Sequence, residues 1–104
     1  MIVEQRDYHV YTGKLNEVVG MYEQEGIPIQ LKHLGRLLGA FTTDIGSLST
    51  YTSLWGYDGY ADREQRRAAL QADPEWRDFL GRLQPLLHTQ HNRILVPTPF
   101  SPIR

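Results

Sequence analysis

The sequence has 104 residues, no cysteine, and eleven basic against twelve acidic side chains, for a formal net charge of −1. This length is typical of one domain, and we expect residues 1–104 to form a single domain with one core. The lack of cysteine excludes disulfides, zinc–thiolate sites and thiol nucleophiles, and the balanced charge without a basic stripe argues against nucleic acid as the main partner.

The N-terminal segment MIVEQRDYHVY carries charged residues and lacks the apolar stretch of a signal peptide. No apolar run in the sequence approaches the ~20 residues that a membrane-spanning helix needs. We therefore expect a cytoplasmic protein without a membrane span.

Residues 2–11 predict the first strand, because Val and Tyr recur there and the turn residues Thr12-Gly13 follow. Side chains alternate along a strand, so Glu4, Arg6 and Tyr8 lie on one face. Neither face is uniformly apolar. This indicates that helices cover one face while the other meets something partly polar.

From Lys14 onward the apolar residues recur with the period of a helix. The stripe consists of Leu15, Val18, Val19 and Tyr22. Gly26 is expected to end this helix, and Pro28 to open a short second helix that runs to about His33.

Residues 37–45 and 50–58 predict the second and third strands. The connection Gly46-Ser47-Leu48-Ser49 favours an antiparallel hairpin. On the third strand Tyr51, Trp55 and Tyr57 share one face with Ser53. Three aromatic side chains on one face indicate either a large packing partner or a ligand.

A second helical region is expected over residues 61–72. Arg63, Arg66 and Arg67 lie there, interleaved with Asp62 and Glu64, a pattern typical of a solvated, salt-bridged helix face.

Asp73-Pro74-Glu75-Trp76 then predicts the start of a further helix, with aspartate as N-cap, proline in the first helical position and glutamate in the first turn. The stripe expected to be buried consists of Trp76, Phe79, Leu80 and Leu83. Pro85 is expected to end or kink this helix.

Residues 88–96 predict the last strand. The tail 96–104 contains three prolines and cannot continue a strand ladder. We expect its apolar residues Phe100 and Ile103 to dock on a partner subunit or on the outer helices.

The predicted order β-α-β-β-α-β is that of a ferredoxin-like α+β fold with a four-stranded antiparallel sheet. Its helices cover one face of the sheet and leave the other bare, with several hundred square ångströms exposed. We expect that face to pair with its copy in a homodimer.

Blocks throughout the sequence resemble the NIPSNAP family. They are MIVEQRDY with Thr12-Gly13-Lys14-Leu15, His33-Leu34-Gly35, Phe41 to Gly46, Ala61 to Leu70, Asp73 to Trp76 and Asn92 to Leu95. The resemblance covers nearly the whole chain. It implies a dimeric α+β barrel, in which the sheets of two ferredoxin-like subunits face each other. It implies no settled activity, because proteins that share this fold include monooxygenases, haem-degrading enzymes, isomerases and decarboxylases.

The residues with chemical potential are Arg6 and Tyr8, which could bind a carboxylate or polarise a carbonyl, and His33, which could act as a general base. These three are the catalytic candidates. Arg6 could equally form a structural ion pair with Glu4, and His33 could simply suit a helix C-terminus.

A ligand-binding pocket is expected to combine Arg6 and Tyr8 with Tyr22, His33, Trp55 and Tyr57, although such aromatic residues also suit a core. His88 and His91 point to opposite faces of a strand, and no HExxH motif or carboxylate cluster exists, so neither a metal nor another cofactor is expected.

Two functions stay open. One is a small-molecule site between sheet and helices, for an apolar or aromatic compound with a carbonyl or carboxylate, possible chemistries being cofactor-free monooxygenation or isomerisation. The other is a non-catalytic homodimer that binds a partner. A pocket of about 300 Å³ or more with converging polar groups would favour the first.

Overall fold

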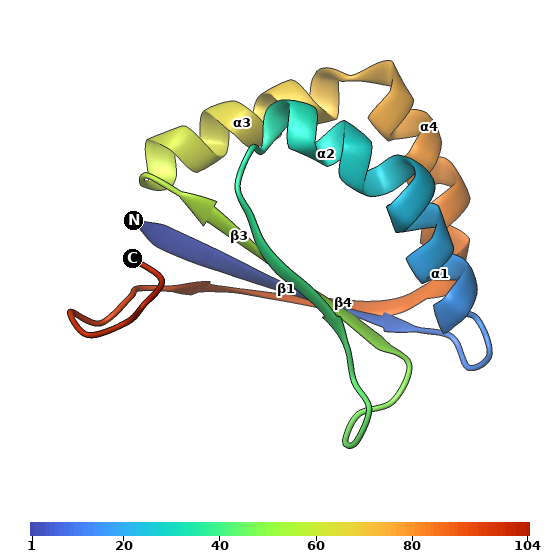
Figure 1. Cartoon of the computed structure of the whole chain (residues 1–104). Coiled ribbons are helices and arrows are strands. Elements are labelled where there is room, and N and C mark those ends of the chain that lie inside the picture. The colour runs from blue at the N-terminus through green and yellow to red at the C-terminus, as the bar shows by residue number, and fades with distance from the viewer.

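The computed structural model describes residues 1–104 and folds them into a four-stranded sheet with helices on one face (Figure 1). The elements in chain order are β1 (Ile2–Val10), α1 (Leu15–Met21), the π-helical turn η1 (Tyr22–Gly26), α2 (Ile27–His33), β2 (Leu37–Thr42), β3 (Thr50–Tyr57), α3 (Tyr60–Ala72), α4 (Pro74–Leu83), the 3-10 turn η2 (Gln84–Leu86) and β4 (Leu87–Leu95).

The sheet has the strand order β2-β3-β1-β4, and every neighbouring pair is antiparallel. The helical run α1–α2 and the pair α3–α4 both cross the same face, so the opposite face carries no helix (Figure 1). This arrangement confirms the predicted α+β, ferredoxin-like subunit. Because β1 lies between β3 and β4, its helix-facing side chains occupy the centre of the molecule.

The first helical run continues through Gly26, so the expectation that Gly26 ends a helix is wrong. Gly26 has a helical backbone, and a Cβ built on it would lie 2.7 Å from Phe79 Cζ and 2.7 Å from Tyr22 Cδ1. The glycine therefore permits close packing against α4. Pro28 is the second residue of α2, in its first turn, which agrees with the prediction that it opens a short helix to about His33.

Replacing Gly26 with alanine is expected to lower the free energy of unfolding by about 1–3 kcal/mol, because the methyl group overpacks the contact with the buried Phe79 ring. Gly20, in α1, is the matched control, since a Cβ there meets nothing within 4 Å. Gly20→Ala should stabilise the protein by up to about 1 kcal/mol through helix propensity. Denaturant titration compares the two; equal stabilities would contradict the packing role of Gly26.

The start of α4 confirms the capping prediction. Asp73 has an extended backbone, its side chain accepts a hydrogen bond of 2.8 Å from the backbone N–H of Glu75, and Pro74 begins the helix. Trp76, Phe79 and Leu83 are buried from this helix. Its apolar face is thereby held over the sheet.

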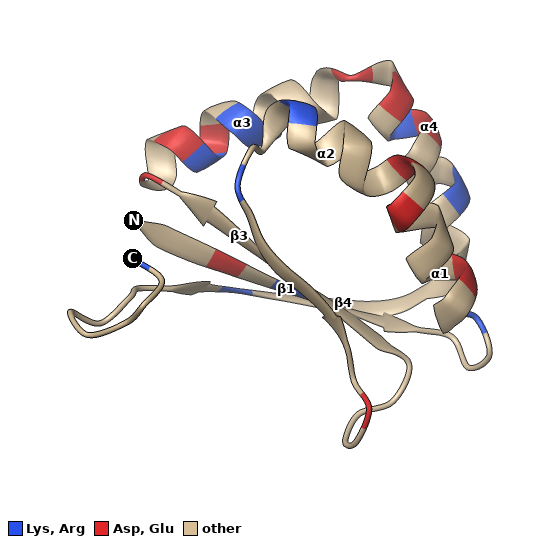
Figure 2. Cartoon of the chain, viewed as in Figure 1, with Lys and Arg blue, Asp and Glu red and all other residues tan.

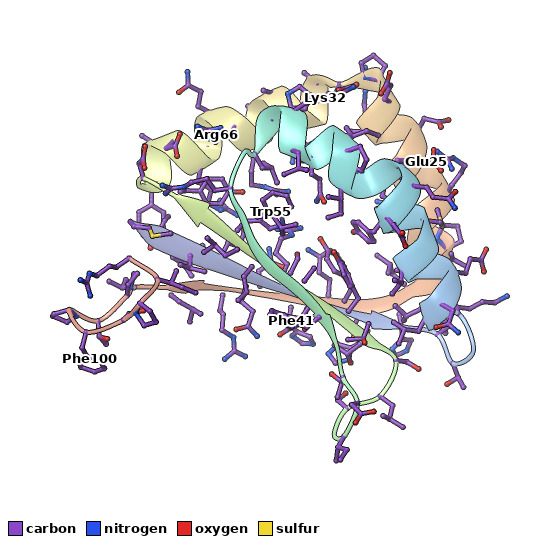
Figure 3. All side chains as sticks on the ribbon, in the orientation of Figure 1. Glu25, Lys32, Phe41, Trp55, Arg66 and Phe100 are labelled. Carbon is purple, nitrogen blue, oxygen red and sulfur yellow. The ribbon has the colours of Figure 1, made fainter.

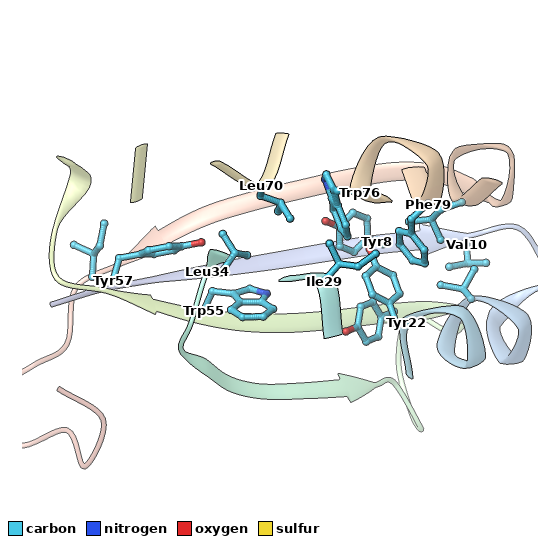
Figure 4. Close-up of a cluster of buried hydrophobic side chains, with 14 residues drawn as sticks. Tyr8, Val10, Tyr22, Ile29, Leu34, Trp55, Tyr57, Leu70, Trp76 and Phe79 are labelled. Carbon is cyan, nitrogen blue, oxygen red and sulfur yellow. The ribbon is translucent and has the colours of Figure 1, made fainter. Parts of the chain in front are cut away.

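An aromatic stack connects the sheet to α4 (Figure 4). Tyr51 lies 6.2 Å from Tyr8 and 4.7 Å from Tyr22 between ring centroids, Tyr22 lies 5.3 Å from Phe79, and Phe79 lies 5.3 Å from Trp76. The rings are tightly packed and leave no space for a ligand among them. Their packing fixes Tyr8 and Trp76 at the two sides of the site described below.

The uncovered face of the sheet is partly apolar. Phe41 pairs with Thr52, which faces away from the helices, and the Phe41 side chain is 56% exposed (Figure 3). Val3 and Leu54 lie on the same face, beside Asp7, whose carboxylate accepts a hydrogen bond of 2.7 Å from Thr52. Most charged residues lie on the helices instead (Figure 2).

The C-terminal tail turns back over one end of this uncovered face. Ile103 and the tail residues 96–98 line an apolar groove of about 290 Å³ together with Val3 and Leu54. The expectation that the tail docks on the outer helices is therefore wrong, because the tail lies against the open sheet face of its own subunit. Phe100 is 84% exposed. None of the helices combines the length and apolar composition needed to cross a bilayer.

Candidate functional site

The site is built around a carboxylate in the middle of β1. Glu4 has no exposed surface, and it accepts hydrogen bonds from Arg6 Nη1 (2.9 Å), Arg63 Nε and Nη2 (3.2 and 2.9 Å) and Asn92 Nδ2 (3.0 Å). Arg6 reaches it because residues two apart on a strand share a face. Arg63 descends from α3, and Asn92 comes from the neighbouring strand β4. A buried carboxylate with this many donors is fully satisfied.

The surroundings of Glu4 keep it ionised. Burial alone would raise its pKa, but the hydrogen bond from Arg63 and the positive charges of Arg6, Arg63 and Arg67 together lower the pKa below its usual value. Glu4 is therefore a weak proton acceptor near neutral pH and acts as an anchor for the arginines.

Arg6 is almost fully buried. Its Nε donates to the hydroxyl of Tyr8 at 2.8 Å, and its Nη1 donates to Glu4. These two bonds use two of the five N–H groups of a guanidinium. The remaining donors have no acceptor within the protein, and Arg6 is one of the residues that line an adjacent cleft.

The cleft lies between the sheet and the helices α3 and α4 and has a volume of about 140 Å³. The buried residues Arg6 and Tyr8 form its base, and the exposed residues Gln71, Gln84 and Gln90 surround its mouth. Arg67 lines it as well. Its apolar wall consists of Trp76, Leu80, Leu83 and Leu87. Polar donors and an apolar wall therefore converge on one small space.

The hydroxyl of Tyr57 is buried and has no partner at full hydrogen-bond geometry. Burial raises the pKa of Tyr57 and the charge of Glu4 raises it further, whereas the charge of Arg67 and a weaker hydrogen bond with its side chain lower it. Figure 4 shows the ring on the helix side of β3 with its hydroxyl directed into the interior.

The structure brings Arg6 and Tyr8 together as expected, but the other predicted site residues do not line the cleft. Tyr22 stacks in the core, 6.2 Å from the ring of Tyr8, and Trp55 is fully buried with an unpartnered Nε1. Tyr57 lies next to the charged cluster but does not line the cleft. The aromatic face of β3 is consequently a core face, because the continuous run α1–α2 packs on it.

His33 lies elsewhere, so the expectation that it joins this pocket is wrong. Its Nε2 lies 2.8 Å from the Asp73 carboxylate, and its backbone carbonyl accepts a hydrogen bond of 3.2 Å from Arg66. The hydrogen bond to His33, together with the one from the Glu75 backbone, lowers the pKa of Asp73. His33 thus ties α2 to the cap of α4.

The arginines of α3 are only partly the solvated face that their sequence pattern predicts. Arg66 does pair with Asp62 at 2.8 Å, but Arg63 pairs with the buried Glu4 and Arg67 lines the cleft. The sequence contains a signal for this inward orientation, because residues 63 and 67 are one helical turn apart and therefore share one face of α3. A glutamate in mid-strand requires such a partner.

A sequence model of the NIPSNAP family matches residues 3–102. Among solved structures, a NIPSNAP family protein from Agrobacterium tumefaciens is 47% identical, with a TM-score of 0.97 over 99% of this chain and 98% of that one. A NIPSNAP-like domain protein from Burkholderia xenovorans is also 47% identical, with a TM-score of 0.94 over 97% of this chain and 88% of that one.

More distant relatives are longer or share the fold alone. Protein NipSnap of Drosophila melanogaster is 34% identical over 68% of this chain, and human NipSnap homolog 3A is 29% identical over 93% of it. The chain spans 26% and 39% of the lengths of these two proteins. A structure named antibiotic biosynthesis monooxygenase is 8% identical, with a TM-score of 0.67 over 95% of this chain and all of that one, and shows the fold only.

Proposed function

This chain belongs to the NIPSNAP family, and we propose that it acts as a homodimer in which each subunit binds a small molecule in the cleft between its sheet and the helices α3 and α4. One observation carries the binding proposal. The guanidinium of Arg6 retains N–H donors that no protein atom accepts, and it lies at the base of an apolar-walled cleft. These donors are not among the polar atoms sealed inside the core, so a ligand that enters the cleft can accept hydrogen bonds from them.

The size of the cleft restricts the ligand. A volume of about 140 Å³ is below the about 300 Å³ at which pockets for drug-sized molecules begin. It corresponds to the liquid volume of about five water molecules. The ligand is therefore a small compound, or only one end of a larger compound enters the cleft.

The lining favours binding over catalysis. No histidine, aspartate, glutamate, lysine or cysteine lines the cleft. Glu4 is the nearest carboxylate, but its pKa is lowered and it already accepts four hydrogen bonds. Proton abstraction, which cofactor-free monooxygenation and isomerisation both require, thus lacks a general base. The cleft therefore lacks a residue for the reaction named for the monooxygenase of similar fold. We propose non-catalytic binding as its function.

The dimer proposal is supported by the uncovered face of the sheet. All helices lie on one side of the sheet (Figure 1), and the other side carries the 56% exposed Phe41 (Figure 3) and the half-buried Leu54. An exposed, partly apolar sheet face on a small protein marks an interaction surface. A second copy of the chain, related by a two-fold axis, covers both faces at once.

Filling the mouth of the cleft tests the binding site. We expect Gln71→Trp to abolish the binding of small aromatic fragments, because an indole replaces an exposed side chain at the mouth. Its free energy of unfolding should stay within about 0.5 kcal/mol of wild type. Gln65→Trp, exposed on the same helix outside the cleft, is the control. Fragment screening by amide chemical shifts gives the readout; fragments that bind both variants alike would refute the site.

A further inference from the structure

The charges at the base of the cleft do not balance. Glu4 is the one carboxylate in the cluster, and three guanidinium groups, those of Arg6, Arg63 and Arg67, act on it. Arg6 and Arg63 bond to it directly, whereas Arg67 does not. The cluster therefore carries a net charge of +2 in a place that is only partly open to solvent.

Arg67 is the unpaired member of the cluster. Four arginines of the chain are buried or half-buried, and three of them have a carboxylate partner: Arg6 and Arg63 with Glu4, and Arg66 with Asp62. Arg67 has none, although it is half-buried and lines the cleft. A half-buried guanidinium without a carboxylate partner is available to bind an anion that enters the cleft.

The cleft has two unlike sides, and the guanidinium groups of Arg6 and Arg67 lie on one of them. The opposite wall is apolar, with Trp76, Leu80 and Leu83, so an inorganic ion would leave it without contacts. A molecule that suits both ends has an anionic group and an apolar body.

We propose that the ligand of the cleft is a small organic acid whose carboxylate binds the guanidinium of Arg67 beside that of Arg6, with its apolar body against Trp76 and Leu83. This inference rests on the proposed binding function and specifies its ligand class. Guanidinium and carboxylate match each other in a bidentate geometry that neutral groups do not reproduce.

Benzoate and benzamide are the probes, because they have nearly the same shape and differ in charge. Amide chemical shifts of the wild-type protein report both affinity and the place of binding. Benzoate should bind in the cleft at least about tenfold more tightly than benzamide, as expected for hydrogen bonds between charged groups. Its affinity, and not that of benzamide, should fall as ionic strength rises.

Arg67→Gln should weaken benzoate at least about tenfold and leave benzamide within about twofold, and the retained benzamide site shows that the variant is folded. Arg77→Gln removes an equal charge from an exposed position outside the cleft and should change neither affinity. Equal binding of both probes in the cleft, or benzoate binding that ignores Arg67→Gln, would overturn the organic-acid inference and leave the binding site standing. If neither probe shifts the cleft residues, both proposals fail.

Discussion

Replacing Glu4 with glutamine is expected to lower the free energy of unfolding by about 3–5 kcal/mol at neutral pH, as when one partner of a buried ion pair is lost. The Glu4 carboxylate accepts from Arg6, Arg63 and Asn92 in the middle of the core-facing strand β1. An amide cannot neutralise two guanidinium groups, and its NH₂ would face their donors. Denaturant unfolding of the variant and the wild type gives the difference.

The pH dependence of the free energy of unfolding of wild type and Glu4→Gln shows whether the charge of Glu4 or its packing stabilises the fold. The pKa of Glu4 is lower in the folded protein than its usual value of 4.5. The ionised carboxylate therefore contributes its full stabilisation of the fold above about pH 4.5, and this stabilisation is lost as pH falls through the folded pKa. The stability gap between wild type and Glu4→Gln should therefore narrow below pH 4.5. A gap that stays constant down to pH 3 would show that packing, not charge, accounts for it.

A surface ion pair provides the control for Glu4. Lys32 and Glu75 lie 3.4 Å apart with more than half of each side chain exposed. Glu75→Gln should cost less than about 1 kcal/mol, as exposed pairs do. If this substitution and Glu4→Gln were equally mild, Glu4 would not be the anchor of the cluster.

If the proposed homodimer pairs through the uncovered sheet face, Phe41→Asp is expected to convert it to monomers at micromolar concentration, raising the dissociation constant at least about 100-fold. Phe41 is 56% exposed on the uncovered sheet face, so the substitution should change the stability of the free subunit little. In a two-fold dimer each substitution occurs twice, and burying two new carboxylates at an interface is strongly unfavourable. Size-exclusion chromatography with light scattering measures the mass.

Leu31→Asp is the matched control for this interface, because Leu31 is 46% exposed on α2, on the helical side of the molecule. It should leave the mass unchanged. Dissociation by Leu31→Asp with an intact Phe41→Asp dimer would place the interface on the helices and refute pairing through the sheet.

The fold could be predicted from the sequence because its local signals agree with one another. The capping residues Asp73 and Pro74 and the alternation along β1 each specify an element independently of its neighbours. The role of Gly26 was predicted wrongly because a glycine that ends a helix and one that permits close packing look alike in sequence. Only the position of Phe79 against it, set by the tertiary packing of α4, separates the two.

The candidate site could be predicted in part. Arg6 and Tyr8 followed from strand alternation, and the structure places both at the cleft. Arg67 was assigned to a solvated face, since charge pattern alone does not show which side of α3 meets the sheet. His33 was misplaced because its partner Asp73 is forty residues away in sequence. Long-range pairs of this kind depend on how helices cross, which local periodicity does not encode.

Sedimentation equilibrium of the wild-type protein at micromolar concentration tests the central proposal, that the bare face of the sheet is covered by a second copy. The subunit has a mass of 12.0 kDa. We expect a single species of twice that mass, stable on dilution. A species that stays at 12.0 kDa over the whole concentration range would contradict the dimer.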